Sequence, residues 1–230
     1  MKTLFDLPPV TAPVKDSDAR FPVHRIYCVG QNYAAHAREM GSDPDREPPF
    51  FFTKPADALV PSGVVIPYPP RTADLHHEVE LVVAIGKAGR DVAPGQAEGH
   101  VFGYAVGIDL TRRDLQLAAK KQGRPWDAAK AFDRSAPMSA ILPADRHGHP
   151  RRGEIRLDVD GEVRQQADIA DLIWSVPEVI AELSTLFELQ AGDLVFTGTP
   201  AGVGPVEPGQ TMVARIEGLE ELVTSIGAAR

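Results

Sequence analysis

The sequence predicts an α+β fold built mainly from strands, and three observations support this prediction. Twenty glycines and 21 prolines among 230 residues indicate many short elements and turns rather than a helical bundle. Segments rich in β-branched residues outnumber helical patterns, and the two kinds do not alternate strictly, which favours a mixed sheet over a doubly wound one. The apolar content of 43% is ordinary for a globular protein, and the chain is long enough to bury a core without disulfides.

The chain is predicted to form one domain behind a short lead. Residues 1–23 contain four prolines and scattered charges, so we expect an extended lead there. Residues 24–230 contain no internal repeat and no change of composition that would mark a second domain.

The first dense segment reads as a strand followed by a short helix. HRIYCVG at 24–30 has the apolar run of a buried strand, and NYAAHAREMG then predicts a helix with Asn32 as N-cap and Gly41 as its end. The charged, proline-rich SDPDREPP at 42–49 is a candidate mobile loop before the phenylalanine run at 50–52.

The middle of the chain supplies more strands and one helix. Three segments bounded by proline, glycine or charge are rich in β-branched residues and predict strands: 64–68, 78–86 and 101–109. TRRDLQLAAKKQG at 111–123 predicts a helix that ends at Gly123, with Leu115 and either Ala118 or Ala119 on its apolar face.

The last third contains the clearest local signals. Asp160-Gly161 between alternating segments predicts a tight β-hairpin. Ser175 and Glu178 form a capping-box pattern before a helix at 176–187, whose apolar residues repeat at helical spacing. The remaining apolar segments predict the closing strands, at 194–200 and 211–226.

Charge and composition exclude several classes of protein. The net charge of −8 and the absence of a basic stripe make nucleic acid an unexpected partner. No apolar stretch reaches the length of a membrane span and the N-terminus lacks a secretion signal, so we expect a cytoplasmic protein that does not enter the membrane. The single cysteine, Cys28, excludes disulfide frameworks, and its apolar neighbours favour a buried small side chain, although a thiol nucleophile paired with His36 stays open.

Three carboxylates predict a metal site. Glu78 and Glu80 stand two apart in a predicted strand, so both project from one face, where two negative charges require a cation or a raised pKa. Asp109 ends another apolar strand and is a candidate third ligand. Such oxygen donors favour magnesium, manganese or calcium. The alternative is an edge strand whose glutamates face water, and the adjacent His76 and His77 are expected to form hydrogen bonds rather than bind metal.

Other residues qualify for chemistry near such a metal. Lys130 stands among small and aromatic residues, where a buried ammonium would stabilise developing negative charge, although a surface lysine is the alternative. His36 and Glu39 share a helix face, so the carboxylate can orient the imidazole as a general base. The turn GTPAGVG at 198–204 fits no nucleotide-binding loop, and either an anion-holding role or a plain turn is compatible with it.

Six segments carry a family resemblance when they are taken in order: GQNYAAHAREMG, PPFFFTKPADALVPSG, LHHEVELVVAIG, GYAVGIDLTRRDLQ, KKQGRPWDAAKAFD and LVFTGTPAGVGPV. Together, over residues 24–226, they resemble the fumarylacetoacetate hydrolase family and its small acylpyruvate hydrolase branch. The resemblance implies that 24–230 is a catalytic domain of the mixed β-roll type, usually paired as a homodimer. The short lead and the lack of a further aspartate before His36 both favour the small branch.

The resemblance also implies roles for individual residues. Magnesium or manganese would be held by three carboxylates, a dyad would activate water, and a lysine would assist: Glu78, Glu80 and Asp109; His36 and Glu39; Lys130. The residues implied to contact substrate are Arg113, Gln116 and Thr199.

The implied reaction is hydrolysis of a carbon–carbon bond in a 3-acylpyruvate, a small 2-oxo acid. Within the branch the motifs most resemble enzymes that convert fumarylpyruvate and water to fumarate and pyruvate in gentisate degradation. The alternative is oxaloacetate decarboxylation, or a related isomerisation or decarboxylation of a diacid, on the same metal site. A non-enzymatic binding protein is a third reading, but it would have no need of the base His36 or its partner Glu39.

Overall fold

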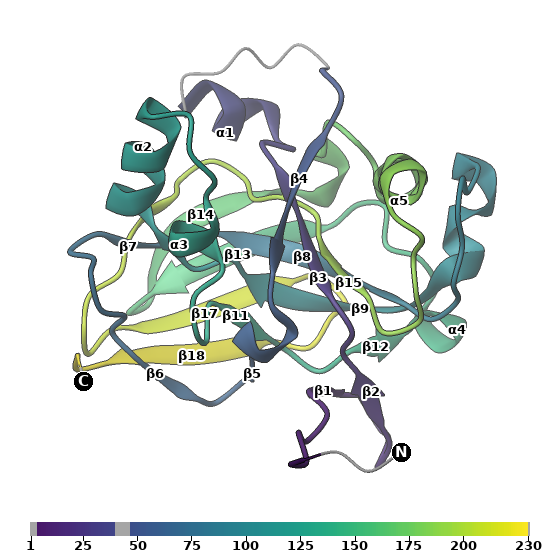
Figure 1. Cartoon of the computed structure of the whole chain (residues 1–230), viewed down its shortest axis with the longest axis horizontal. Coiled ribbons are helices and arrows are strands. Elements are labelled where there is room, and N and C mark those ends of the chain that lie inside the picture. Colours follow the sequence, from purple (N-terminus) through teal and green to yellow (C-terminus); the bar gives the residue numbers. More distant parts are fainter. Residues whose placement is uncertain (1–3, 40–46, 230) are drawn as a thin grey trace.

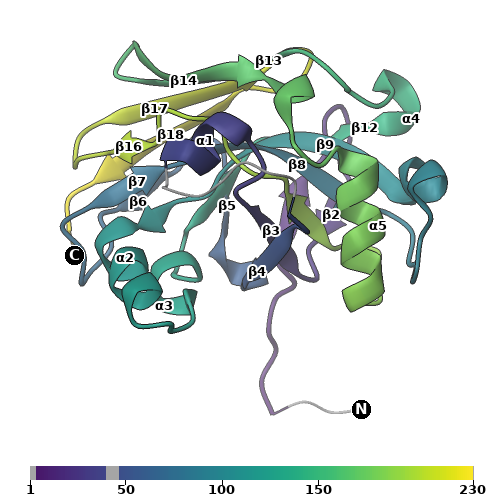
Figure 2. The same ribbon diagram turned by 90° about the horizontal axis from the view of Figure 1, so that it is seen from above.

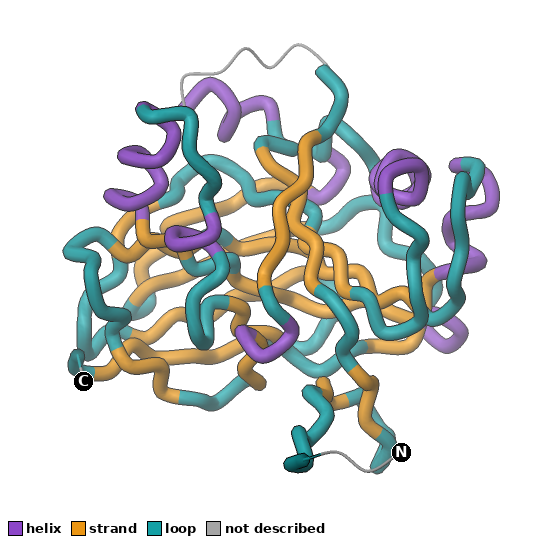
Figure 3. Tube along the Cα trace, viewed as in Figure 1, coloured by secondary structure: helices purple, strands orange, loops and turns teal. Residues whose placement is uncertain are grey.

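Two large sheets form the body of the protein in the computed structural model (Figures 1 and 3). The structure describes residues 4–39 and 47–229, apart from the side chains of Ala37 and Glu39. Strands dominate and helices lie around them, so the predicted α+β class is confirmed. The end of the first helix at Gly41 and most of the loop at 42–49 fall outside the described residues.

The larger sheet has eight strands and mixed direction. Its path runs β4 (Phe50–Lys54), β3 (Ile26–Gly30), β15 (Leu194–Phe196), β8 (Val79–Ile85), β9 (Val101–Ile108), β11 (Ala136–Met138) and β5 (Leu59–Pro61), and β12 (Leu142–Pro143) also pairs with β9. The pairs β3–β15 and β5–β11 are parallel, whereas the other pairs are antiparallel. The strands predicted around residues 24–30, 78–86, 101–109 and 194–200 all belong to this sheet.

The smaller sheet packs across the larger one, as Figure 2 shows from above. Its order is β14 (Glu162–Asp168), β13 (Glu154–Val159), β17 (Thr211–Ile216), β18 (Leu222–Gly227) and β6 (Val65–Pro67). Asp160 and Gly161 connect β13 to β14 with positive φ angles of 51° and 83°, as a two-residue hairpin of the primed type requires. The predicted hairpin is therefore confirmed.

Two minor sheets complete the strands. One consists of β10 (Thr111–Arg112), β7 (Leu75–His77) and β16 (Gly204–Pro205). The other is a hairpin of β1 (Thr11–Pro13) and β2 (Arg20–Pro22) within the N-terminal lead, which projects below the body in Figure 1.

The helices are short and lie at the rim of the sheets: α1 (Ala34–Glu39), α2 (Arg113–Lys121), α3 (Asp127–Lys130), α4 (Ala144–His147), α5 (Val176–Leu186), and the 3₁₀ turns η1 (Ala56–Ala58), η2 (Pro94–His100) and η3 (Ile169–Asp171). The Glu178 carboxylate accepts the Ser175 N–H at 3.0 Å, which supports the predicted capping box of α5. Within the part of the chain that the structure describes, each helix is too short or too polar to cross a bilayer.

Two sequence predictions about helices are wrong. Asn32 does not cap α1, which begins at Ala34; its side chain bonds to backbone groups of Trp174 and Thr197. The buried face of α2 consists of Arg113 and Gln116, whereas the predicted apolar face is intermediate or exposed. Both errors have one cause. Capping patterns and apolar periodicity are local, so they do not reveal which polar side chains are bound by a segment distant in the sequence.

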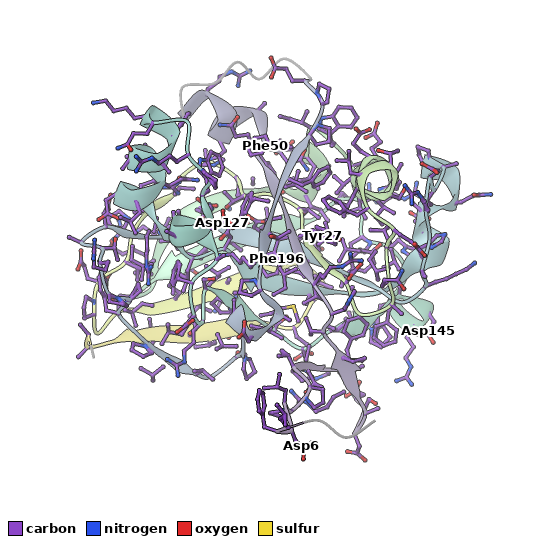
Figure 4. All side chains as sticks on the ribbon, viewed as in Figure 1. Asp6, Tyr27, Phe50, Asp127, Asp145 and Phe196 are labelled. Carbon is purple, nitrogen blue, oxygen red and sulfur yellow. The ribbon has the colours of Figure 1, made fainter. Side chains whose placement is uncertain are left out.

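Strand β8 is buried on both faces, and this positions the site. Val79, Leu81, Val83 and Ile85 join a core cluster with residues of the five-stranded sheet. Val82 and Ala84 face the opposite side and join a second cluster that contains Phe196, labelled at the centre of Figure 4. Because side chains alternate along a strand, Glu80 projects toward this second side.

Candidate functional site

The three predicted carboxylates meet where β8 and β9 pair. Glu80 lies opposite Gly107, and the Asp109 N–H donates to the Glu78 carbonyl at 2.8 Å, so Glu78 and Asp109 oppose each other across the two strands. One oxygen from each of Glu78, Glu80 and Asp109 lies within 4.8 Å of the others, and all three residues are buried. The alternative of water-facing glutamates on an edge strand is therefore wrong.

This carboxylate triad (Glu78, Glu80 and Asp109) fits a hard divalent cation. Ligands of one magnesium, manganese or calcium ion stand about 2.0 to 2.6 Å from it, so oxygens that share an ion lie no more than about 5 Å apart. Burial and the neighbouring Asp109 and Glu78 charges raise the pKa of Glu80 well above its usual range. That shift identifies negative charge that the surrounding protein does not fully compensate, which is what a cation site requires.

Two cations hold Glu78 in its charged form. Lys130 donates to the Glu78 Oε2 atom at 2.8 Å and to the Asp109 Oδ2 atom at 2.7 Å, and Arg113 pairs with the other Glu78 oxygen. Burial alone would raise the pKa of Glu78, but Lys130 and Arg113 lower it below its ordinary value. The carboxylates Asp109 and Glu78 likewise outweigh burial and raise the pKa of Lys130, so this lysine stays charged and is not a surface lysine.

Lys54 is a site residue that the sequence analysis missed. Its Nζ atom lies 2.7 Å from Asp109 Oδ1 and also donates to the Leu110 and Lys130 carbonyls, and the residue is 2% exposed. Small and aromatic neighbours in the sequence indicate that Lys130 is buried. Lys54 has similar neighbours in FFFTKPADA. Side chains alternate between the two faces of a strand, and this alternation could have identified Lys54 as a buried residue.

A pocket opens directly over the triad. Its lining brings together most of the predicted residues: His36 from α1, Glu78 and Glu80, Arg113 and Gln116 from α2, Lys130 from α3, and Thr199. Asp109 lies below, fully buried. Arg113 also donates to the Gln116 amide oxygen, which aligns the two on the pocket side of α2. The side chain of Glu39 lies outside the described residues, so its pairing with His36 stays a prediction.

Aromatic rings line the outer part of the pocket. Trp126 contacts both Phe50 and Phe52, with ring centroids 5.5 Å apart for Phe50–Trp126 and 6.0 Å apart for Phe52–Trp126. Figure 4 labels Phe50 near the top of the molecule, above the buried centre. The pocket therefore combines a charged floor with an apolar entrance, a combination that suits a small acid with a carbon chain.

The segment after β15 brings its backbone against the triad. The Gly198 N–H donates to the Glu80 Oε2 atom at 2.7 Å, and Thr197 bonds to the Leu81 carbonyl. Both an anion-holding role and a plain turn were compatible with the GTPAGVG sequence, and the group that its Gly198 N–H contacts is the Glu80 carboxyl of the protein itself. Thr199, the next residue, lines the pocket.

The neighbouring histidines and the cysteine stand apart from the metal-binding geometry. His76 bonds to Asp74 at 2.8 Å and His77 to Gln165 at 3.0 Å, so both engage in hydrogen bonds as expected, and neither belongs to the triad. Cys28 is fully buried, and burial raises the pKa of its thiol well above the usual value. This environment suits an inert thiol and not a nucleophile.

Comparison with known proteins gives one consistent family. The family model "Fumarylacetoacetate (FAA) hydrolase C-terminal" matches residues 25–227. A fumarylpyruvate hydrolase from Ralstonia sp. is 46% identical over 192 residues, which are 83% of this chain and 100% of that protein. An oxaloacetate tautomerase from Arabidopsis thaliana is 44% identical over 198 residues, covering 86% of this chain and 88% of that one.

A solved structure matches the whole fold. The crystal structure of fumarylpyruvate hydrolase from Pseudomonas aeruginosa in complex with Mn²⁺ and pyruvate superposes with a TM-score of 0.97 at 57% identity. The match covers 99% of this chain and 100% of that one, so the β-roll architecture is shared in full.

Proposed function

Because the chain belongs to the fumarylacetoacetate hydrolase family, we propose that it hydrolyses a carbon–carbon bond in a 3-acylpyruvate, converting fumarylpyruvate and water to fumarate and pyruvate. The observation that carries the proposal is the 57% identity to the fumarylpyruvate hydrolase that binds Mn²⁺ and pyruvate. The pocket supports it, because a buried carboxylate triad and two cations lie beneath an aromatic entrance.

The triad would hold magnesium or manganese. When bound, that cation supplies Lewis acidity toward the carboxylate and 2-oxo oxygens of the substrate. Lys130 and Arg113 already hold Glu78 in its anionic form, which is the form a metal ligand must take. Gly198 and Lys54 fix the positions of the Glu80 and Asp109 side chains, through a 2.7 Å contact each.

His36 is the proposed general base, oriented by Glu39. It is buried and lines the same pocket as the triad. In this mechanism its imidazole takes a proton from a water molecule, whose oxygen attacks the substrate carbonyl beyond C3. The bond between C3 and that carbonyl then breaks, the acyl group leaves as fumarate, and pyruvate departs as its enolate and takes a proton at C3.

Lys130 and the substrate-contacting residues would stabilise this change of charge. The Lys130 ammonium lies at the pocket floor beside Glu78 and Asp109, where it offsets negative charge that develops on the enolate. Arg113 and Gln116 present N–H groups from one face of α2, and Thr199 presents a hydroxyl to the same pocket. These groups suit the carboxylate of a 2-oxo acid.

Oxaloacetate chemistry is the second candidate. The observation that favours it is the 44% identity to an oxaloacetate tautomerase, close to the 46% identity to the curated fumarylpyruvate hydrolase. Tautomerisation and decarboxylation of oxaloacetate both pass through an enol or enolate, which the same cationic floor would stabilise. Neither reaction requires attack by water.

The test compares substrates and one variant. The purified protein is assayed with fumarylpyruvate, acetylpyruvate and oxaloacetate, with Mg²⁺ or Mn²⁺ and after chelation. We expect metal-dependent release of pyruvate from fumarylpyruvate as the fastest reaction, and we expect His36→Ala to abolish it while sparing much of any oxaloacetate activity. A dominant rate with oxaloacetate would refute the hydrolase assignment, and equal loss of both activities would refute the role of His36.

A further inference from the structure

Gln165 connects the second sheet to the pocket. It lies on β14 of the five-stranded sheet and is fully buried, whereas Thr199 follows β15 of the larger sheet. The Gln165 Nε2 atom donates to Thr199 Oγ1 at 2.7 Å and to the Pro200 carbonyl at 2.8 Å. Gln165 has no role in the proposed hydrolysis, and it lies outside the motifs that carry the family resemblance.

The orientation of this amide is determined by its neighbours. The Gln165 Oε1 atom accepts the Val79 N–H at 3.0 Å and lies 3.0 Å from His77 Nδ1. A backbone N–H can only donate and the Pro200 carbonyl can only accept, so a flipped amide would lose both contacts. His77 therefore carries its proton on Nδ1, and Gln165 presents N–H groups to Thr199.

This orientation decides the role of the Thr199 hydroxyl. Because Thr199 Oγ1 accepts from Gln165, its proton is directed elsewhere, and Thr199 lines the pocket beside the triad. We propose that Gln165 is a positioning residue, which makes the Thr199 hydroxyl a hydrogen-bond donor to an anionic oxygen of the 2-oxo acid substrate. This inference rests on the proposed function, because it requires such an acid in the pocket.

The backbone is built to permit this contact. Gly202 has a φ of +93°, and a Cβ atom there would lie 2.1 Å from the Arg164 carbonyl, so the segment after Thr199 packs directly on β14. The register of β13 and β14 shifts just beyond the Leu157–Gln165 pair. Gln165 points inward while its neighbour Gln166 is exposed, which supplies a matched control.

The test measures coupling between Gln165 and Thr199 in the Mn²⁺-loaded protein. Gln165→Glu keeps an oxygen for the Val79 N–H but places a second oxygen against Thr199, so the hydroxyl donates to it and not to the pocket. We expect the Kd for pyruvate to rise, and kcat/KM for fumarylpyruvate to fall, by about 10- to 100-fold. Thr199→Val should do the same, and the double variant should be no worse than the poorer single variant.

The controls separate positioning from folding. Gln166→Glu should bind pyruvate like the wild type, because Gln166 is exposed and does not contact Thr199. Thr199→Ser keeps a hydroxyl donor, so it should lose less affinity for pyruvate than Thr199→Val. If Gln165→Glu does not fold, Gln165→Met has the same length and should show the same coupling to Thr199→Val. Two results would overturn the proposal. One is that the effects of the Gln165 and Thr199 substitutions multiply in the double variant, and the other is that Gln165→Glu melts at lower temperature yet binds pyruvate normally. A wild-type protein that neither binds pyruvate nor cleaves fumarylpyruvate would instead remove the proposed function, and this inference with it.

Discussion

Asp109 is held by two lysines that come from distant parts of the sequence. Lys130 contacts its Oδ2 atom and Lys54 contacts its Oδ1 atom, each at 2.7 Å, and both lysines and Asp109 are buried. Buried charges are tolerated only when they are paired, so each of these groups depends on the others. The role of Lys54 in this arrangement is to fix the third carboxylate of the triad.

Lys54→Met is expected to destabilise the protein strongly. It leaves one side of the buried Asp109 carboxylate without its cation, a change that costs about 3–5 kcal/mol when one partner of a buried pair is removed. Urea unfolding measures the free energy. Lys87→Met, at an exposed lysine, is the control and should change stability by less than about 0.5 kcal/mol. Equal effects at the two positions would show that the Lys54–Asp109 pair contributes nothing.

At the scale of elements, the segment from Thr197 to Pro200 is the clearest case of structure that serves the site. Gly198 has a φ of +102°, and a Cβ atom there would lie 2.7 Å from the Asn32 Cβ atom. The residue thus needs both glycine's backbone freedom and its lack of a side chain. Only then does its N–H reach Glu80.

Gly198→Ala is expected to be more damaging than Gly209→Ala. Both positions have positive φ, at +102° and +93°, but nothing lies within 4 Å of a Cβ built at Gly209. Backbone strain of about 1–3 kcal/mol is common to both variants, and the clash with Asn32 is particular to Gly198. Thermal unfolding and Mn²⁺ affinity are the measurements. Equal melting temperatures with unchanged metal affinity would contradict the close packing of this segment.

The elements also show how far a sequence pattern reaches. Alternation, turn residues and capping predicted β8, β9, the β13–β14 hairpin and α5 near their observed bounds. Helix α2 was predicted as an element, but its buried face was not. The buried residues, Arg113 and Gln116, lie where α2 lines the pocket and not against the apolar core. Periodicity of apolar residues cannot detect a polar face that is buried for function.

At the scale of the whole molecule, the charge of the triad affects stability in opposite ways with and without metal. Glu80 is 2% exposed, and its pKa is raised because burial, Asp109 and Glu78 all oppose its ionisation. The pKa of Glu80 is therefore higher in the folded protein than in the unfolded chain. The stability that this difference contributes is fully present below the unfolded pKa and is lost as the pH rises toward the folded pKa. A bound cation would reverse this cost.

Glu80→Gln tests that balance. Without metal, we expect the variant to gain stability relative to the wild type between about pH 5 and pH 8. In this range the wild type must either bury an uncompensated charge at Glu80 or take up a proton there on folding, whereas glutamine requires neither. With Mn²⁺ at about 100 times its Kd, the wild type should melt about 5–10 °C higher, whereas the variant should hardly respond.

Scanning calorimetry of the chelated and Mn²⁺-loaded proteins gives both readings. Glu207→Gln, at an exposed glutamate, is the control and should match the wild type throughout. A variant that gains as many degrees from Mn²⁺ as the wild type would remove Glu80 from the metal site. The expected cytoplasmic location and homodimer stay predictions, and sedimentation equilibrium of the purified chain would test the dimer.

The sequence by itself determined the α+β class, most of the elements, the three carboxylates and, through resemblance, the residues around them. These features are local, since a strand, a turn or a motif can be recognised from a few neighbouring residues. Only the tertiary structure decided that Lys54 reaches Asp109, that Gly198 serves Glu80 and that Gln165 orients Thr199. Each of these contacts joins residues tens of positions apart, and the pairing of the strands, not the chemistry of any one segment, brings them within hydrogen-bond distance.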